Sequence, residues 1–176
     1  MSEILIELCA GRNPGRWYSD GRAWIRHDVL FHDLIDNAVG HYGGDVYDFL
    51  KKQKDSSVSG YVMNHALEHF NYQEGNHDGW YTTVDDILRE IRRTLKPGGS
   101  LHIEVPNIAG SAKEYLLGNI SGEQFCEYLY GGSEDQWNVH YCGFVKESLE
   151  RRLVKHGFEP NVIDIGLVLV ADAIKK

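Results

Sequence analysis

Carboxylate side chains recur at the ends of the first predicted strands, where an α/β sheet would bind a ligand. Glu7 ends a short apolar run, and Asp28 and Asp48 end later ones at intervals of 21 and 20 residues. An acid about 20 residues beyond a small-residue turn is typical of nucleotide-binding sheets, because its carboxylate can accept both hydrogen bonds of a ribose diol. The spacing favours a nucleotide-type ligand; the alternative is that these acids are simply solvated.

A second segment that could do chemistry runs from His65 through Glu68 to His69. It matches H-x-x-E-H, a pattern in which two histidines on one helical face bind zinc and the glutamate acts as a base. A zinc hydrolase would need a third ligand from elsewhere, such as Glu147 or Glu150. It is the lesser alternative because it leaves the strand-end acids unexplained, and we assign no metal ligand.

Alternating strands and helices must position these residues. Short apolar runs predict strands over 4–8, 23–28, 45–48, 58–63, 100–105, 162–165 and 167–171. The clearest helix has an apolar stripe from Val84 to Leu95, a capping box of Thr83 and Asp86, and a stop at 97–99. Further helices are predicted after Ser121 and over 145–153. The last two strands are too close in sequence for a parallel crossover, so they should pair antiparallel.

This order predicts an α/β fold: a Rossmann-like, mostly parallel seven-stranded sheet with an antiparallel C-terminal edge strand and helices on both faces. The length favours one domain over 1–176. An aromatic-rich stretch follows the fifth strand, so 106–144 is predicted to be a substrate-cap segment; a small secondary core is the alternative. Four basic residues opposite the apolar stripe predict a solvated helix face: Arg89, Arg92, Arg93 and Lys96.

Three motifs resemble those of class I S-adenosylmethionine-dependent methyltransferases, in particular a type 11-like branch. Residues 6–11 resemble the first motif of that family, 95–101 its LKPGG motif, and 67–69 its LEH triplet. The resemblance implies S-adenosylmethionine as the cofactor. It also implies which residues bind the cofactor. The methionine end would contact Glu7, Cys9, Ala10 and Gly11, and the ribose would contact Asp28. The adenine would contact Asp48 and Phe49, and Asn64 and His65 would line the cofactor.

The first motif departs from the family at Cys9, where a glycine is usual and gives the backbone freedom to pass close to the ligand. An alternative is therefore a degenerate, non-catalytic cofactor-binding or interaction module of the same fold. The main expectation is a methyltransferase acting on a small-molecule or saccharide-like acceptor. Methyl transfer depends on alignment and needs a base only for a poor nucleophile, for which His140 and His69 are the catalytic candidates.

The amino-acid composition limits the kinds of molecule that we expect the protein to bind. The net charge of −8 disfavours nucleic acid and anionic membrane surfaces, so we expect a small-molecule substrate. No stretch approaches the ~18 consecutive apolar residues of a membrane span. Three cysteines without CxxC spacing favour a reducing, cytoplasmic setting. The composition allows a dimer but does not require one, so the oligomeric state is left unassigned.

Overall fold

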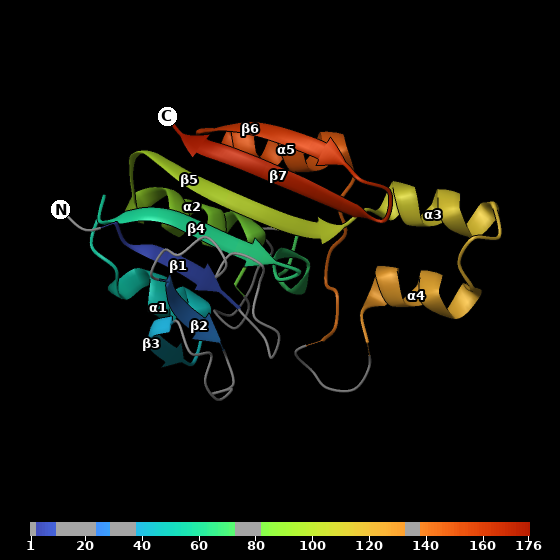
Figure 1. Cartoon of the computed structure of the whole chain (residues 1–176), viewed down its shortest axis with the longest axis horizontal. Coiled ribbons are helices and arrows are strands. Elements are labelled where there is room, and N and C mark those ends of the chain that lie inside the picture. Colours follow the sequence, from blue (N-terminus) through green and yellow to red (C-terminus); the bar gives the residue numbers. More distant parts are fainter. Residues whose placement is uncertain (1–2, 10–23, 29–37, 73–81, 133–137) are drawn as a thin grey trace.

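A seven-stranded sheet forms the centre of the protein in a computed structural model, which describes residues 3–9, 24–28, 38–72, 82–132 and 138–176 (Figure 1). The strands are β1 (Leu5–Leu8), β2 (Trp24–Asp28), β3 (Ala38–Gly43), β4 (Val58–Asn64), β5 (Leu95–Pro106), β6 (Phe158–Asp164) and β7 (Val168–Lys175). Their order across the sheet is β3-β2-β1-β4-β5-β7-β6. The predicted Rossmann-like α/β fold is thereby confirmed.

The five strands from β3 to β5 run parallel, whereas β7 runs antiparallel to both of its neighbours. Antiparallel pairing of the last two strands is confirmed, but the prediction that the antiparallel strand lies at the edge is wrong. A tight turn at Gly166 joins β6 to β7, and Gly166 N donates to Asp164 Oδ1 at 2.8 Å. Because β7 also hydrogen-bonds to β5, β6 is left as the outer strand.

Helices α1 (Val46–Lys52), α2 (Val84–Thr94) and α5 (Lys146–Lys155) lie on the same face of the sheet, behind it in Figure 1. The predicted stripe of α2 is confirmed, since Val84, Ile87, Leu88 and Ile91 are all fully buried against the strands. Both hydrogen bonds of its capping box are present. The connections that would cover the opposite face, 10–23 and 29–37, lie outside the described residues, so helices on both faces stay a prediction.

The strand predicted over 45–48 is wrong, because these residues begin helix α1. The side chain of Asp45 accepts a hydrogen bond from the backbone N–H of Asp48 at 3.0 Å. An acid in this position satisfies a free N–H group of the first helical turn and so favours a helix. The third strand is β3, which ends at Gly43, two residues before this cap.

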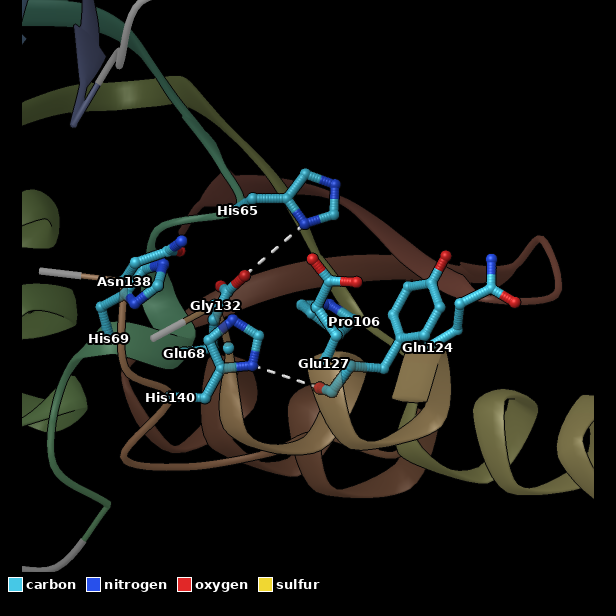
Figure 2. A pocket seen from close by; sticks show the side chains of 11 residues that line it. His65, Glu68, His69, Pro106, Gln124, Glu127, Gly132, Asn138 and His140 are labelled. Atoms are coloured by element: carbon cyan, nitrogen blue, oxygen red, sulfur yellow. Dashed lines mark hydrogen bonds and ion pairs between the residues drawn. The ribbon is translucent and has the colours of Figure 1, made fainter. Parts of the chain in front are cut away.

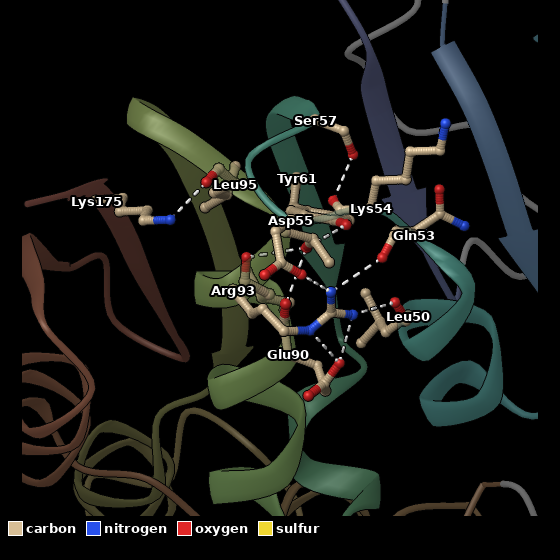
Figure 3. A network of polar contacts seen from close by, with 12 residues as sticks. Leu50, Gln53, Lys54, Asp55, Ser57, Tyr61, Glu90, Arg93, Leu95 and Lys175 are labelled. Atoms are coloured by element: carbon tan, nitrogen blue, oxygen red, sulfur yellow. Dashed lines mark hydrogen bonds and ion pairs between the residues drawn. The ribbon is translucent and has the colours of Figure 1, made fainter.

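Arg93 ties the C-terminal end of α1 to α2 (Figure 3). Its guanidinium donates to the carbonyl oxygens of Leu50 at 3.1 Å and Gln53 at 3.0 Å, and it pairs with Glu90 at 2.7 Å and with Asp55. Carbonyl groups in the last turn of a helix have no partner within the helix, and a cation there satisfies them. The prediction of a solvated face is therefore wrong for Arg93, whose side chain is only 29% exposed.

Helices α3 (Ile108–Leu116) and α4 (Gly122–Tyr130) form a hairpin beyond the carboxyl end of β5 (Figure 1). The rings of Tyr115 and Phe125 stack between them with centroids 4.9 Å apart. After the hairpin the chain returns to its starting point, where Ile108 N donates to the carbonyl of Phe144 at 3.0 Å. The excursion corresponds to the segment predicted as a cap, 106–144.

Candidate functional site

The carboxyl ends of β1 and β4 lie side by side, because Leu8 pairs with Met63 in parallel register. Cys9 and Asn64 therefore come next to each other as the two strands end. Cys9 has φ 53° and His65 has φ 48°, a left-handed conformation that non-glycine residues seldom adopt. The segments that follow β1 and β4 thus both turn sharply at this edge of the sheet, and such strained turns are concentrated at functional sites.

Three of the residues predicted to bind the cofactor reach this edge from neighbouring strands. Glu7 is buried in β1, Asn64 ends β4, and Asp28 ends β2, which pairs with β1 on the other side. The side-chain oxygen of Asn64 is buried and has no hydrogen-bond partner among the described residues. Such an orphaned acceptor fits a ligand that donates an N–H or O–H group. Ala10 and Gly11 lie outside the described residues.

The resemblance implies adenine contacts at Asp48 and Phe49, but Asp48 does not end a strand as predicted. Both lie in the first turns of α1, and the Phe49 side chain is 7% exposed within the hydrophobic core. The first acid after β3 is Asp45, which the sequence reasoning missed. The Gly43-Gly44-Asp45 sequence was the available signal, since two glycines before an acid mark a strand end followed by a helix cap.

A pocket of about 380 Å³ opens beyond the carboxyl ends of β4 and β5 (Figure 2). Its walls are the segment after β4, the end of β5, helix α4 and the chain at 138–140. His65, His69 and His140, all singled out from the sequence, are brought together here. Most of the lining is polar: His65, Glu68, His69, Pro106, Gln124, Glu127, Tyr128, Gly131, Gly132, Asn138 and His140.

The two predicted catalytic histidines are fixed by the backbone. His69 Nδ1 lies 3.0 Å from the carbonyl oxygen of Val139, and His140 Nδ1 lies 3.1 Å from that of Tyr128. Because a carbonyl only accepts, each Nδ1 carries the proton, and each Nε2 of the neutral ring is left with a free lone pair. The rings meet edge to face with centroids 5.0 Å apart.

Glu68 lies beneath these histidines and is 1% exposed. Its Oε1 is 3.5 Å from His65 Nδ1, too long for a good hydrogen bond, and neither carboxyl oxygen has a hydrogen-bond partner within the described chain. The Glu68 carboxyl raises the pKa of His65 against the opposing effect of burial. Burial lowers the pKa of His140, and the charge of Glu68 opposes that shift. The histidines therefore differ in their preferred charge state.

The chain at 138–142 is held against the LEH triplet, which forms the short 3-10 helix η2 (Leu67–His69). The carbonyl of Glu68 accepts from the backbone N–H groups of Tyr141 at 2.9 Å and Cys142 at 3.2 Å. The same segment also passes close to the end of α4, where Gly131 has φ 77° and a Cβ would lie 1.9 Å from the Asn138 carbonyl oxygen. Sequence reasoning placed Tyr128 in the aromatic-rich cap segment, but it did not identify Gln124, Glu127 or Asn138 as pocket residues, because no local pattern marks that role.

The H-x-x-E-H interpretation is not supported. That pattern needs both histidines on one helical face. The short helix η2 covers only Leu67–His69, and His65 lies before it with a left-handed backbone conformation. The groups that do converge are Glu68, His69 and His140: one carboxyl oxygen and one ring nitrogen from each histidine lie within 4.8 Å of one another.

Within the part of the chain that the structure describes, no helix has the length and apolar character that a membrane span requires.

Comparison with known proteins identifies the fold. No protein-family profile and no curated protein matches the sequence. Among solved structures, a SAM dependent methyltransferase from Archaeoglobus fulgidus aligns with 99% of this chain and 86% of its own, at 15% identity and a TM-score of 0.66. A 1,6-didemethyltoxoflavin-N1-methyltransferase from Burkholderia thailandensis, solved with S-adenosylhomocysteine, covers 99% of this chain and 72% of its own at 18% identity and a TM-score of 0.64.

A third methyltransferase structure, from Methanosarcina mazei, covers 99% of this chain and 92% of its own, at 16% identity and a TM-score of 0.61. The Archaeoglobus and Methanosarcina proteins are described as S-adenosylmethionine-dependent, and the Burkholderia enzyme was solved with S-adenosylhomocysteine, the product of that cofactor. The chain therefore has the class I S-adenosylmethionine-dependent methyltransferase fold, as the sequence motifs indicated.

Proposed function

We propose that the protein is an S-adenosylmethionine-dependent methyltransferase that acts on a small, polar, saccharide-like acceptor. The observation that carries this proposal is the position of the pocket beside the strand-end edge. His65 follows β4 at that edge and also lines the pocket. A ligand held at the ends of β1 and β4 would thus adjoin a second ligand in the pocket, which is the arrangement that transfer between two molecules requires.

The cofactor would lie along the carboxyl ends of β1, β2 and β4. Glu7, Cys9, Asn64 and His65 would contact it, and the sequence resemblance adds Ala10 and Gly11 to this set. Asp28 would accept from the ribose, since it ends the neighbouring strand. We place the adenine contact at Asp45, directly after β3, in preference to Asp48 and Phe49. When bound, the cofactor supplies an electrophilic methyl group.

The pocket favours an acceptor with several hydrogen-bonding groups. Gln124, Asn138 and the histidines offer donors and acceptors, while Tyr128 offers an aromatic ring. A volume of about 380 Å³ is in the range of small-molecule sites, about 300–1,000 Å³. The carboxyl groups of Glu68 and Glu127 would repel phosphates, which disfavours nucleic acid as the substrate. No disulfide joins Cys9, Cys126 and Cys142, which suits a reducing compartment such as the cytoplasm.

His140 and His69 are proposed to contact the reacting group of the acceptor. The protein's main task in this reaction is alignment, and the bonds to Val139 and Tyr128 hold both rings in place without involving Nε2. Helix α4 and residues 138–140 line the pocket, which supports the proposal that the segment 106–144 acts as the acceptor cap.

The test is release of S-adenosylhomocysteine from S-adenosylmethionine in the presence of a panel of monosaccharides, oligosaccharides and other small polyols. We expect at least one acceptor to raise the rate above the acceptor-free background. Gln124→Glu, which keeps the oxygen that accepts from Ser121 N at the start of α4 but removes the amide donor, should raise the KM for that acceptor. A matched change outside the pocket, Glu159→Gln, should leave the KM unaltered. If the whole panel is inert while nucleic acid or protein is methylated, the proposed acceptor class is wrong.

A further inference from the structure

Glu68 is a buried acid that the methyl-transfer scheme leaves without a role. It is 1% exposed, its two oxygens have no hydrogen-bond partner in the described part of the chain, and His65 Nδ1 lies 3.5 Å from its Oε1. Burying a carboxyl group is costly unless another polar group or a metal ion compensates it. Figure 2 shows this side chain pointing toward the imidazoles and the pocket.

The two histidines beside it are oriented as metal ligands usually are. A metal-bound imidazole almost always donates its other N–H to a carbonyl or carboxylate, which fixes the ring and its tautomer. His69 and His140 each do so through Nδ1, to Val139 and to Tyr128. In the neutral form of each ring, Nε2 is therefore the nitrogen with a free lone pair, which a metal ligand needs.

We infer that Glu68, His69 and His140 bind a divalent transition-metal ion. Their ligand atoms lie within 4.8 Å of one another. Atoms that share a cation at bonds of about 2.0–2.2 Å are about 3–3.5 Å apart, so the side chains need to close by roughly 1 Å. Two imidazoles and one carboxylate suit Zn²⁺, Co²⁺ or Fe²⁺, whereas Mg²⁺ and Ca²⁺ prefer all-oxygen ligands.

Three protein ligands leave coordination positions open, and these face the pocket. The role of the ion there rests on the proposed function: it would bind a hydroxyl of the acceptor and lower the pKa of that hydroxyl, so that its proton passes to water. His69 and His140 would then act on the acceptor through the ion and would not accept the proton themselves. His65 is outside the set, since its Nδ1 faces Glu68 and its side chain is 49% exposed.

The inference is tested by titrating metal-free full-length protein with Co²⁺ and following the visible d–d absorption. We expect one ion per chain at micromolar affinity, displaced by Zn²⁺ but not by Mg²⁺. Glu68→Gln, His69→Gln and His140→Gln should each weaken binding by at least tenfold, with far-UV circular dichroism confirming that each variant is folded. His65→Gln, which removes the rival ligand, and His156→Gln, which removes a histidine bound to Asp85, should bind within threefold of the parent.

Absence of binding below millimolar Co²⁺, or equal loss in the His65 variant, would overturn the assignment. A second titration, of S-adenosylhomocysteine with EDTA present, separates this inference from the proposed function. Cofactor binding without Co²⁺ binding would refute the metal site alone. Co²⁺ binding without cofactor binding would support the metal site while refuting the methyltransferase.

Discussion

The imidazole rings of His69 and His140 meet edge to face at a centroid distance of 5.0 Å. They come from distant parts of the sequence, one from η2 after β4 and the other from the chain that follows the α3–α4 hairpin. The backbone bonds from Tyr141 and Cys142 to Glu68 fasten the two segments together. The way the α3–α4 hairpin folds back therefore determines how His140 lies relative to His69 in the pocket.

Replacing either histidine should impair transfer and spare the cofactor. We expect His140→Gln and His69→Gln each to lower kcat by about 10²-fold or more, because each removes a group that holds the acceptor's reacting atom in line, directly or through the proposed ion. The Kd for S-adenosylhomocysteine should stay within threefold, since both rings lie in the pocket and not at the β1–β4 edge. His156→Gln is the matched control for losing a histidine. Full turnover by His140→Gln would remove that residue from the site.

The left-handed conformation of Cys9 should make this position intolerant of branched side chains. Such side chains at positive φ are strained, whereas glycine is not. We expect Cys9→Val to lower the free energy of unfolding by about 1–2 kcal/mol relative to Cys9→Gly. Urea denaturation of the two variants measures the difference. Equal stabilities would show that the chain does not turn here as described.

The buried acid Asp85 should make stability depend on pH in the acid range. Burial alone would raise the pKa of Asp85, but hydrogen bonds from Lys155 and His156 and the charge of Arg152 lower it to about 2. A carboxyl group with a depressed pKa in the folded state stabilises the protein above its ordinary value of 3.8, and this contribution is lost as the pH falls toward 2.

Asp85→Asn should therefore lower the free energy of unfolding by about 1–3 kcal/mol at pH 6, because it weakens charged hydrogen bonds. The difference from the parent should shrink progressively below pH 4 and be nearly gone at pH 2. Urea denaturation between pH 2 and 7 measures it, with the exposed Glu159→Gln as the control. A difference that does not change with pH would contradict the assigned ion pairs.

Two arginines on α2 provide a matched comparison of an exposed ion pair with a partly buried network of ion pairs and hydrogen bonds. Arg93→Met removes bonds to Leu50, Gln53 and Glu90 and should lower the free energy of unfolding by about 1–3 kcal/mol. Arg89→Met removes one pair with Asp86 from a side chain that is 54% exposed, and should cost no more than about 0.5 kcal/mol. Thermal and urea denaturation give both values. Equal losses would contradict the role of Arg93 in joining α1 to α2.

Local signals explain where the fold could be predicted from the sequence. Helix α2 carries an apolar stripe, a complete capping box and a Pro-Gly-Gly stop, and all of these act within the helix or next to it. Strand β3 has no such pattern: its sequence AVGHYG holds two glycines, and pairing with β2 forms it. The segment 45–48 looked like a strand because Val46 and Tyr47 have β propensity, but the cap by Asp45 outweighs that preference.

The candidate site likewise has residues that the sequence could predict and residues that it could not. His65, His69 and His140 were recognisable by residue type, and the family motifs pointed to Asn64 and Glu7. Burial of Glu68, its lack of partners and its convergence with His140 depend on how the α3–α4 hairpin folds back, which no local pattern encodes. The sequence therefore identified the histidines but could not show which carboxyl group joins them.

The most direct test of the account is calorimetric titration of the protein with S-adenosylhomocysteine, repeated on Asn64→Ala and Asp28→Ala. We expect micromolar binding that weakens by at least tenfold, about 1.4 kcal/mol, in each variant. His140→Ala, in the acceptor pocket, should bind like the parent. No binding to the well-folded parent protein would contradict the account and would indicate that the fold is kept for a purpose other than methyl transfer.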